Sequence, residues 1–196
     1  MLLTKLKVLH ALHNYNGARR LAERAQEKLL VASLQLTGNL ASVIKSQALS
    51  RGDEEQRLAL LQHSLELYGQ AFTEPLFEGS YWLGVNALAL ATCLGKSDYV
   101  RLHIDSVRAD CLKATKPDET PDFWTLATVA ELDLIDLLTS NDVGPEKISG
   151  MLSSYARAEE QCETLQQRKS ARKNMGLLLG YVEKKEPERA KALRTA

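Results

Sequence analysis

The sequence predicts an all-α protein, built as a superhelical solenoid of about four helix pairs and closed by a C-terminal capping helix. The chain is rich in strong helix formers such as Leu, Ala, Glu, Gln, Lys and Arg, and only 6% of its residues are aromatic. No stretch alternates apolar and polar residues between turn signals, as a half-buried strand would. Glycine and proline divide the chain into helix pairs of about 34–45 residues, a period typical of helical solenoids.

The first two pairs are separated by short polar breaks. Residues 14–17 (Asn-Tyr-Asn-Gly) interrupt the first pair, and residues 51–53 (Arg-Gly-Asp) interrupt the second. Asp53 is a suitable N-cap, because a short carboxylate can accept the free amide protons of the next helix. These signals predict helices at 2–13, 18–32, 33–50 and 54–73.

The later pairs carry clearer capping signals. Gly95 is expected to end a helix, and Ser97 or Asp98 to cap the next one. Thr120 as cap with Pro121 at the first helical position is a favoured helix start. The predicted helices are 80–94, 98–114, 120–138, 146–167 and the cap 169–185. We therefore expect one domain, 1–196, with repeats at about 2–32, 33–73, 80–114 and 120–167.

The second helix of each pair has a recurring pattern at positions i, i+4 and i+7. These positions share one helical face, and small residues there let a neighbouring helix approach while a large middle residue fills the groove. The members are Ala18, Ala22 and Ala25; Ser64, Tyr68 and Ala71; Val100, Ile104 and Val107; and Met151, Tyr155 and Ala158. The pattern resembles that of tetratricopeptide repeats, so we expect it to face the core.

Two longer segments extend this resemblance. The first segment, 65–95, contains Tyr68-Gly-Gln-Ala71-Phe72, then Gly84-Val85-Asn86-Ala87-Leu88-Ala89-Leu90, and ends at Leu94-Gly95. The second segment, 122–138, contains Trp124-Thr-Leu-Ala127-Thr128-Val-Ala130-Glu131. Together they resemble the divergent tetratricopeptide domain, often called the TRAF-binding domain, of stress-activated kinase kinase kinases and related bacterial proteins. An upstream motif of that family is only partly kept in 38–45, where Ala41 and Ser42 replace its glycine and arginine. The resemblance covers about 37–160. It implies a regulatory interaction module of the kind found within signalling proteins, and it does not imply an activity.

Charge and cysteine content argue against several functions. The 25 basic and 25 acidic residues balance, so no global field attracts nucleic acid or an anionic membrane. Cys93, Cys111 and Cys162 lack CxxC spacing, which favours small apolar helix residues over a disulfide framework or a thiolate zinc site. No apolar run approaches the ~18 residues of a membrane span, and no signal peptide is evident. We expect a cytoplasmic protein that is not inserted in a membrane; the sequence indicates no oligomeric state.

The basic stretch at 166–173 allows two interpretations. It lacks the interleaved aromatic residues of a single-strand binding surface. We therefore favour a solvated capping helix rather than a nucleic-acid site, because a solenoid needs a helix to cover its last apolar face.

The sequence shows no catalytic constellation. It contains no phosphate-binding glycine loop, no nucleophile elbow and no HExxH motif. His10 and His13 are three residues apart but have no carboxylate or thiolate at ligand spacing, which favours a solvated or half-buried pair over a metal site. Asp133 and Asp136 are expected on a solvent-exposed helix face. We therefore predict neither an enzyme nor a bound metal or cofactor.

Polar residues within apolar helix faces are the best candidates for a binding site. In a tetratricopeptide array the first helices line a concave groove, so Lys45, Asn86 and Glu131 could form a polar ladder across its floor. Burying the Glu131 carboxylate without a partner would be costly. The ladder is either a ligand or peptide site or a hydrogen-bonded network that fixes the register of the repeats. The candidate groove residues are Lys45, Tyr81, Trp82, Asn86, Trp124, Thr128 and Glu131.

These observations predict a protein–protein interaction module, a scaffold or regulator within a signalling assembly, that binds a protein or peptide in its groove. The alternative is a small-molecule or nucleotide sensor belonging to a larger effector.

Overall fold

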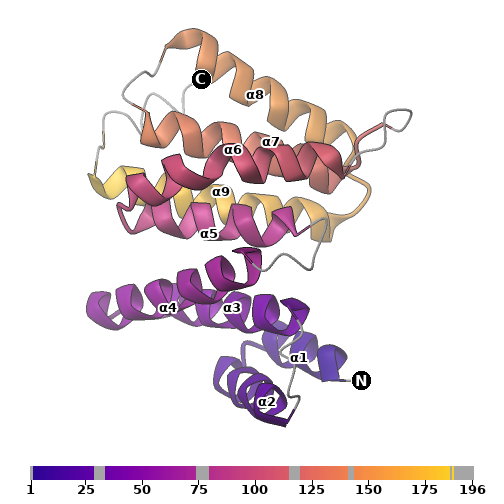
Figure 1. The fold of residues 1–196 in the computed structure, drawn as a ribbon, viewed down its shortest axis with the longest axis vertical. Helices are drawn as coiled ribbons and strands as arrows, with labels where there is room; N and C mark the ends of the chain where they lie inside the picture. The colour runs from indigo at the N-terminus through magenta and orange to yellow at the C-terminus, as the bar shows by residue number, and fades with distance from the viewer. Residues whose placement is uncertain are drawn as a thin grey trace. The chain divides into compact units, whose positions relative to one another are not determined.

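The computed structural model describes residues 2–28, 34–73, 80–114, 120–140, 144–185 and 187. These residues form nine α-helices and no strand (Figure 1), which confirms the all-α prediction. The chain divides into two compact units, unit 1 (Met1–Leu76) and unit 2 (Phe77–Ala196). The single array of repeats stays a prediction. The helices are α1 Leu2–Ala11, α2 Tyr15–Lys28, α3 Leu34–Leu49, α4 Glu54–Thr73, α5 Tyr81–Cys93, α6 Ser97–Lys113, α7 Phe123–Thr139, α8 Pro145–Glu160 and α9 Leu165–Lys185.

In unit 1 each helix packs against the next along the chain, and α1 also contacts α3. The apolar core lies among α1, α2 and α3, and alanines on α2 let the helices approach closely. Its buried members are Leu6, Ala18, Ala22, Leu36, Leu40, Val43 and Ile44.

The start of α2 differs from the prediction, because the helix begins at Tyr15 and not at residue 18. The Asn14 Oδ1 accepts a hydrogen bond from the backbone N–H of Gly17 at 3.0 Å, so Asn14 is the N-cap. Residues 15–17, which were expected to interrupt the helices, form the first turn of α2. A Cβ at Gly17 would lie 2.8 Å from Asn14 Oδ1, which explains the glycine. The first helix ends at Ala11 and not at residue 13 as predicted, and His13 follows it with φ of 56°, outside the helix. Residues 29–33, which belong to the predicted helices 18–32 and 33–50, lie outside the described part of the chain.

The start of α4 follows the prediction. Asp53 Oδ1 accepts the backbone N–H of Gln56 at 3.0 Å, which confirms Asp53 as the N-cap.

In unit 2, α5 packs on α6, α6 on α7 and α7 on α8, while α9 contacts both α5 and α7 (Figure 1). The predicted stop at Gly95 is confirmed. Gly95 has φ of 70°, and the amides of Gly95 and Lys96 donate to the carbonyls of Thr92 (3.0 Å) and Ala91 (2.8 Å). This is a Schellman motif, in which glycine adopts the left-handed conformation without a steric cost.

Two predicted caps in unit 2 are wrong. Helix α6 starts at Ser97 after Lys96, and no side chain caps it; Asp98 lies inside its first turn, where its charge favours the helix N-terminus. The cap of α7 is Asp122, whose Oδ1 accepts the Thr125 amide at 2.8 Å, and not Thr120. A carboxylate directly before the helix reaches the free amides better than a hydroxyl two residues earlier.

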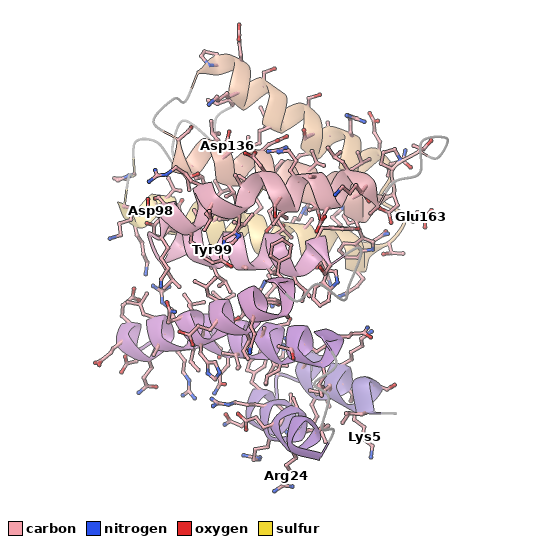
Figure 2. All side chains as sticks on the ribbon, in the orientation of Figure 1. Lys5, Arg24, Asp98, Tyr99, Asp136 and Glu163 are labelled. Carbon is pink, nitrogen blue, oxygen red and sulfur yellow. The ribbon has the colours of Figure 1, made fainter. Side chains whose placement is uncertain are left out.

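The last two helices also have different boundaries from those predicted. Helix α8 ends at Glu160 and α9 begins at Leu165, so the break falls at 161–164, where Glu163 lies exposed at the surface (Figure 2). Thr164 and Gln167 form a capping box: Thr164 Oγ1 accepts the Gln167 amide at 3.2 Å, and Gln167 Oε1 accepts the Thr164 amide at 2.8 Å. The reciprocal bonds start a new helix where the sequence pattern suggested a continuous one.

The predicted core face of the second helices is confirmed. Among the described residues of α6, the buried ones are Val100, Ile104, Val107 and Cys111. In α2, α4 and α8 all signature positions are buried except Ala25 and Tyr155, which are half-buried.

Candidate functional site

Apart from Tyr81, the predicted groove residues of unit 2 lie on one stripe of α5 and one stripe of α7. Trp82, Asn86 and Cys93 recur at helical spacing along α5, and Trp124 and Glu131, two turns apart, share a face of α7. Because α5 packs beside α7, the two stripes can contribute to a common surface.

Helix α9 covers the C-terminal part of this surface. The Asn174 amide of α9 donates to the Glu131 Oε2 at 3.1 Å, and the Cys93 thiol donates to the Leu177 carbonyl at 3.9 Å. Leu178, which follows Leu177 in α9, is buried. Glu131 is therefore part of a helix–helix contact, not of an open groove floor.

The N-terminal ends of the two stripes are open. Trp82 is 38% exposed and Trp124 is 43% exposed, and each is the second residue of its helix. The Trp124 ring packs edge-on against the buried Phe123, with centroids 5.1 Å apart. Asn86 is half-buried and donates from Nδ2 to the Trp82 carbonyl at 2.7 Å, which ties it to its own helix.

The other two predicted residues of unit 2 are Tyr81, which is half-buried, and Thr128, which is buried. Burial raises the pKa of the Tyr81 phenol above 10.0, a hydrogen bond with the Thr125 side chain opposes this, and the Asp122 carboxylate adds to the rise. Tyr81 therefore lies against the start of α7. Thr128 is buried on α7.

Lys45 lies in unit 1, buried on α3, with Nζ 5.7 Å from the centroid of the Tyr68 ring on α4. A cation over an aromatic face is stabilised by the quadrupole of the ring. The ladder of Lys45, Asn86 and Glu131 spans two units and stays a prediction.

The prediction that Asp133 lies on a solvent-exposed face is wrong. Its carboxylate joins three helices. Its Oδ1 accepts from Arg108 Nη1 of α6 at 2.7 Å, and its Oδ2 accepts from the Ser154 hydroxyl of α8 at 2.7 Å. The charged pair is mostly shielded from water, so each bond is stronger than a typical surface contact. Asp136, one turn further, is half-buried.

A pocket of about 270 Å³ lies between α7, α8 and α9. An ion pair between Arg168 Nε and Glu159 Oε1, 2.6 Å apart, borders it. The Tyr155 hydroxyl is buried and has no hydrogen-bond partner within the described residues. Burial, and then the nearby Glu131 and Asp133 carboxylates, raise the pKa of Tyr155 far above 10.0. The lining residues are Phe123, Ala127, Tyr155, Ala156, Ala158, Glu159, Arg168, Ala171, Arg172 and Met175.

Sequence reasoning missed this pocket. The sequence pattern predicts Arg168 and Arg172 on a solvated helix, because it does not show the break at 161–164 that turns α9 back onto α7. The signal that could have revealed it was the Thr-x-x-Gln capping box at 164–167.

The two histidines near the end of α1 form separate contacts. His10 Nε2 is hydrogen-bonded to the Ser46 hydroxyl at 2.7 Å, and His13 Nδ1 to the Tyr15 hydroxyl at 2.7 Å. In the described part of the chain, no three His, Cys, Asp or Glu side chains cluster as metal ligands would.

Every helix in the described ranges is too short or too polar to cross a lipid bilayer. Comparison of the chain with protein-family models, curated proteins and solved structures finds no significant match. The proposed function therefore rests on the geometry of the chain's own residues.

Proposed function

We propose that this protein is a protein–protein interaction module of tetratricopeptide type, acting as a scaffold or regulator in a cytoplasmic signalling assembly. The observation that carries the proposal is the pair of exposed tryptophans, Trp82 and Trp124, at matching positions of the adjacent helices α5 and α7.

Exposed tryptophans are unfavourable in water and are the residues most enriched among the energetic centres of protein interfaces. The pair lies at the open end of a face whose other end already accepts a helix, α9. The same face is therefore suited to an apolar helix or extended segment of a partner.

The nearby pocket offers a place for one anchoring side chain of that partner. Phe123 lines the pocket and also touches Trp124, so both features meet at the start of α7. At about 270 Å³ the pocket is below the ~300–1,000 Å³ typical of sites for drug-sized ligands, which favours an inserted side chain.

The test is recovery of a partner with the wild-type chain and with the double variant Trp82→Ala/Trp124→Ala. We expect the wild type to bind one partner stoichiometrically and the double variant to bind it at least ~30-fold more weakly, because loss of a hot-spot aromatic costs about 2 kcal/mol or more.

The matched control is Leu102→Ala, which removes the most exposed large apolar side chain among those described, on α6 of the same unit. It should leave the affinity unchanged. Equal binding by the double variant, with helix content preserved by circular dichroism, would exclude the tryptophan face as the interaction surface.

A further inference from the structure

The first half of α9 places positive charge beside the pocket between α7, α8 and α9. From Leu165 to Val182 the helix contains no carboxylate, and its four cations all fall in the first half. Two of them line the pocket together with Phe123 of α7, so the charge lies next to the residue that touches Trp124. The cations are Arg168, Lys169, Arg172 and Lys173.

Leu165, Lys169 and Arg172 form a strip along one face of α9, because residues at i, i+4 and i+7 share a face. All three side chains are exposed, Leu165 to 63%. Neither Lys169 nor Arg172 forms an ion pair or a side-chain hydrogen bond with a residue that the structure describes. The strip therefore offers two cations and one apolar side chain at the rim of the pocket.

The inner wall of the pocket is apolar. Its buried members, which belong to one core cluster, are Phe123, Ala127 and Ala158. Among the described lining residues Glu159 is the one carboxylate, and it already pairs with Arg168, whose Nε lies 2.6 Å from its Oε1. A side chain that enters the pocket would therefore meet apolar walls, while Arg172 could pair with an anion next to that side chain.

The positive charge is local, and this decides the kind of partner. Glu160 is exposed at the end of α8, and Glu163 is exposed in the following turn (Figure 2). A nucleic acid or an anionic membrane is attracted by an extended surface of one sign, which this mixture of charges does not form. Two cations beside an apolar pocket instead suit a protein segment whose few carboxylates have fixed positions.

We propose that the segment bound at the tryptophan face is an acidic amphipathic helix of a partner protein. A large apolar side chain of that helix enters the pocket, and two carboxylates one turn apart pair with Lys169 and Arg172. These two cations are three residues apart on α9, so their spacing of about 5–6 Å between Cβ atoms matches that of carboxylates at i and i+3 or i+4. The inference rests on the proposed function, since Phe123 joins the pocket to Trp124.

The experiment selects peptides of ~16 residues, about four helical turns, from a random display library with the full chain as target. We expect the enriched peptides to share a large apolar residue and two acidic residues three or four positions apart. A selected peptide should bind at least about fivefold more weakly when the salt concentration rises from ~0.05 M to ~0.5 M, because salt screens charge pairs at an exposed rim.

Reversal of the two cations in Lys169→Glu/Arg172→Glu should weaken binding of the selected peptide at least about tenfold. The control is Lys96→Glu/Lys185→Glu, which makes the same change of net charge at two exposed positions outside the pocket. It should change the affinity by no more than about twofold, since distant charges are screened. All four lysine and arginine side chains are exposed, so both variants should fold, which circular dichroism checks.

The outcomes separate this inference from the proposed function. Peptides that need Trp82 and Trp124 but carry no acidic residues would overturn the inference and leave the proposed function standing. Acidic peptides that bind Trp82→Ala/Trp124→Ala as tightly as the wild type would contradict the tryptophan face while supporting the acidic segment. Enrichment of no peptide, equal binding by Lys169→Glu/Arg172→Glu, or tighter binding of single-stranded oligo(dT) through the same two cations would each overturn the inference.

Discussion

The pairs α3–α4 and α7–α8 have the same tyrosine position but opposite surroundings. Tyr68 of α4 is buried beneath the ammonium of Lys45, whereas the buried hydroxyl of Tyr155 in α8 lies near the carboxylates of Glu131 and Asp133. In both pairs the charged residue comes from the preceding helix. The pattern at positions i, i+4 and i+7 thus specifies where the tyrosine ring packs. It does not specify whether the charges around the ring stabilise it.

The surroundings of Tyr68 therefore stabilise the fold, whereas those of the Tyr155 hydroxyl do not. A cation over the Tyr68 ring is attractive, while a buried hydroxyl without a partner near two anions is unfavourable. The second arrangement borders the pocket between α7, α8 and α9, next to the face that we propose for partner binding. Evolution tolerates such local costs most often at functional sites.

The largest effect is expected from Tyr68→Ala. Removing a fully buried ring should lower the free energy of unfolding by about 3–5 kcal/mol, because it leaves a cavity in the core. Urea unfolding measures the change. Tyr68→Phe keeps the ring and is the control, expected to cost about 1 kcal/mol or less; a similar small loss for Tyr68→Ala would show that the ring is not part of the core.

An intermediate effect is expected from Asp133→Asn. Arg108 would lose its anionic partner and Ser154 a charged acceptor, which should cost about 1–2 kcal/mol in a partly shielded site. Asp136 lies three residues further along α7 (Figure 2) and has no comparable side-chain bond to another described residue. Asp136→Asn should therefore change stability by no more than about 0.5 kcal/mol. Equal results for the two variants would contradict the role assigned to Asp133.

The smallest effect at neutral pH is expected from Tyr155→Phe. Because the hydroxyl has no hydrogen-bond partner within the described residues, its removal should leave stability unchanged or raise it by up to about 1 kcal/mol. Thermal and urea unfolding at pH 7 check this. A clear loss of stability would mean that the hydroxyl makes a favourable interaction.

The same variant should change the pH dependence in alkali. The folded-state pKa of Tyr155 is raised above 10.0, so the folded protein keeps the phenol proton while the unfolded chain loses it. The free energy of unfolding therefore falls as pH rises above about 10, by up to about 1.4 kcal/mol per pH unit for this group. Cys111, whose pKa burial raises to about 12, contributes in the same direction. The difference in slope between Tyr155→Phe and wild type isolates the Tyr155 part.

The helices and their core faces could be predicted because they depend on local periodicity. Asp53 and Gly95 act as predicted, since capping and left-handed turns need only neighbouring residues. The errors at Asn14, Asp122 and Thr164 also concern local signals, where one capping residue was preferred to another or a capping box was overlooked.

The site could be predicted only in part, because it depends on which helices meet. Periodicity placed Trp82, Asn86, Trp124 and Glu131 on common stripes, but no local pattern shows that α9 covers Glu131. The same limit applies to Asp133, whose partners are 25 and 21 residues away in the chain.

The contact of α9 with α5 also bears on how unit 2 folds. In a linear array each repeat interacts only with its neighbours, so ends can fray and folding can begin anywhere. Here Cys93 and Leu177, 84 residues apart, are in contact, which joins α5 to α9. Such a long-range closure slows folding but makes it more cooperative, so unit 2 should melt in one transition and lose its protected amides together.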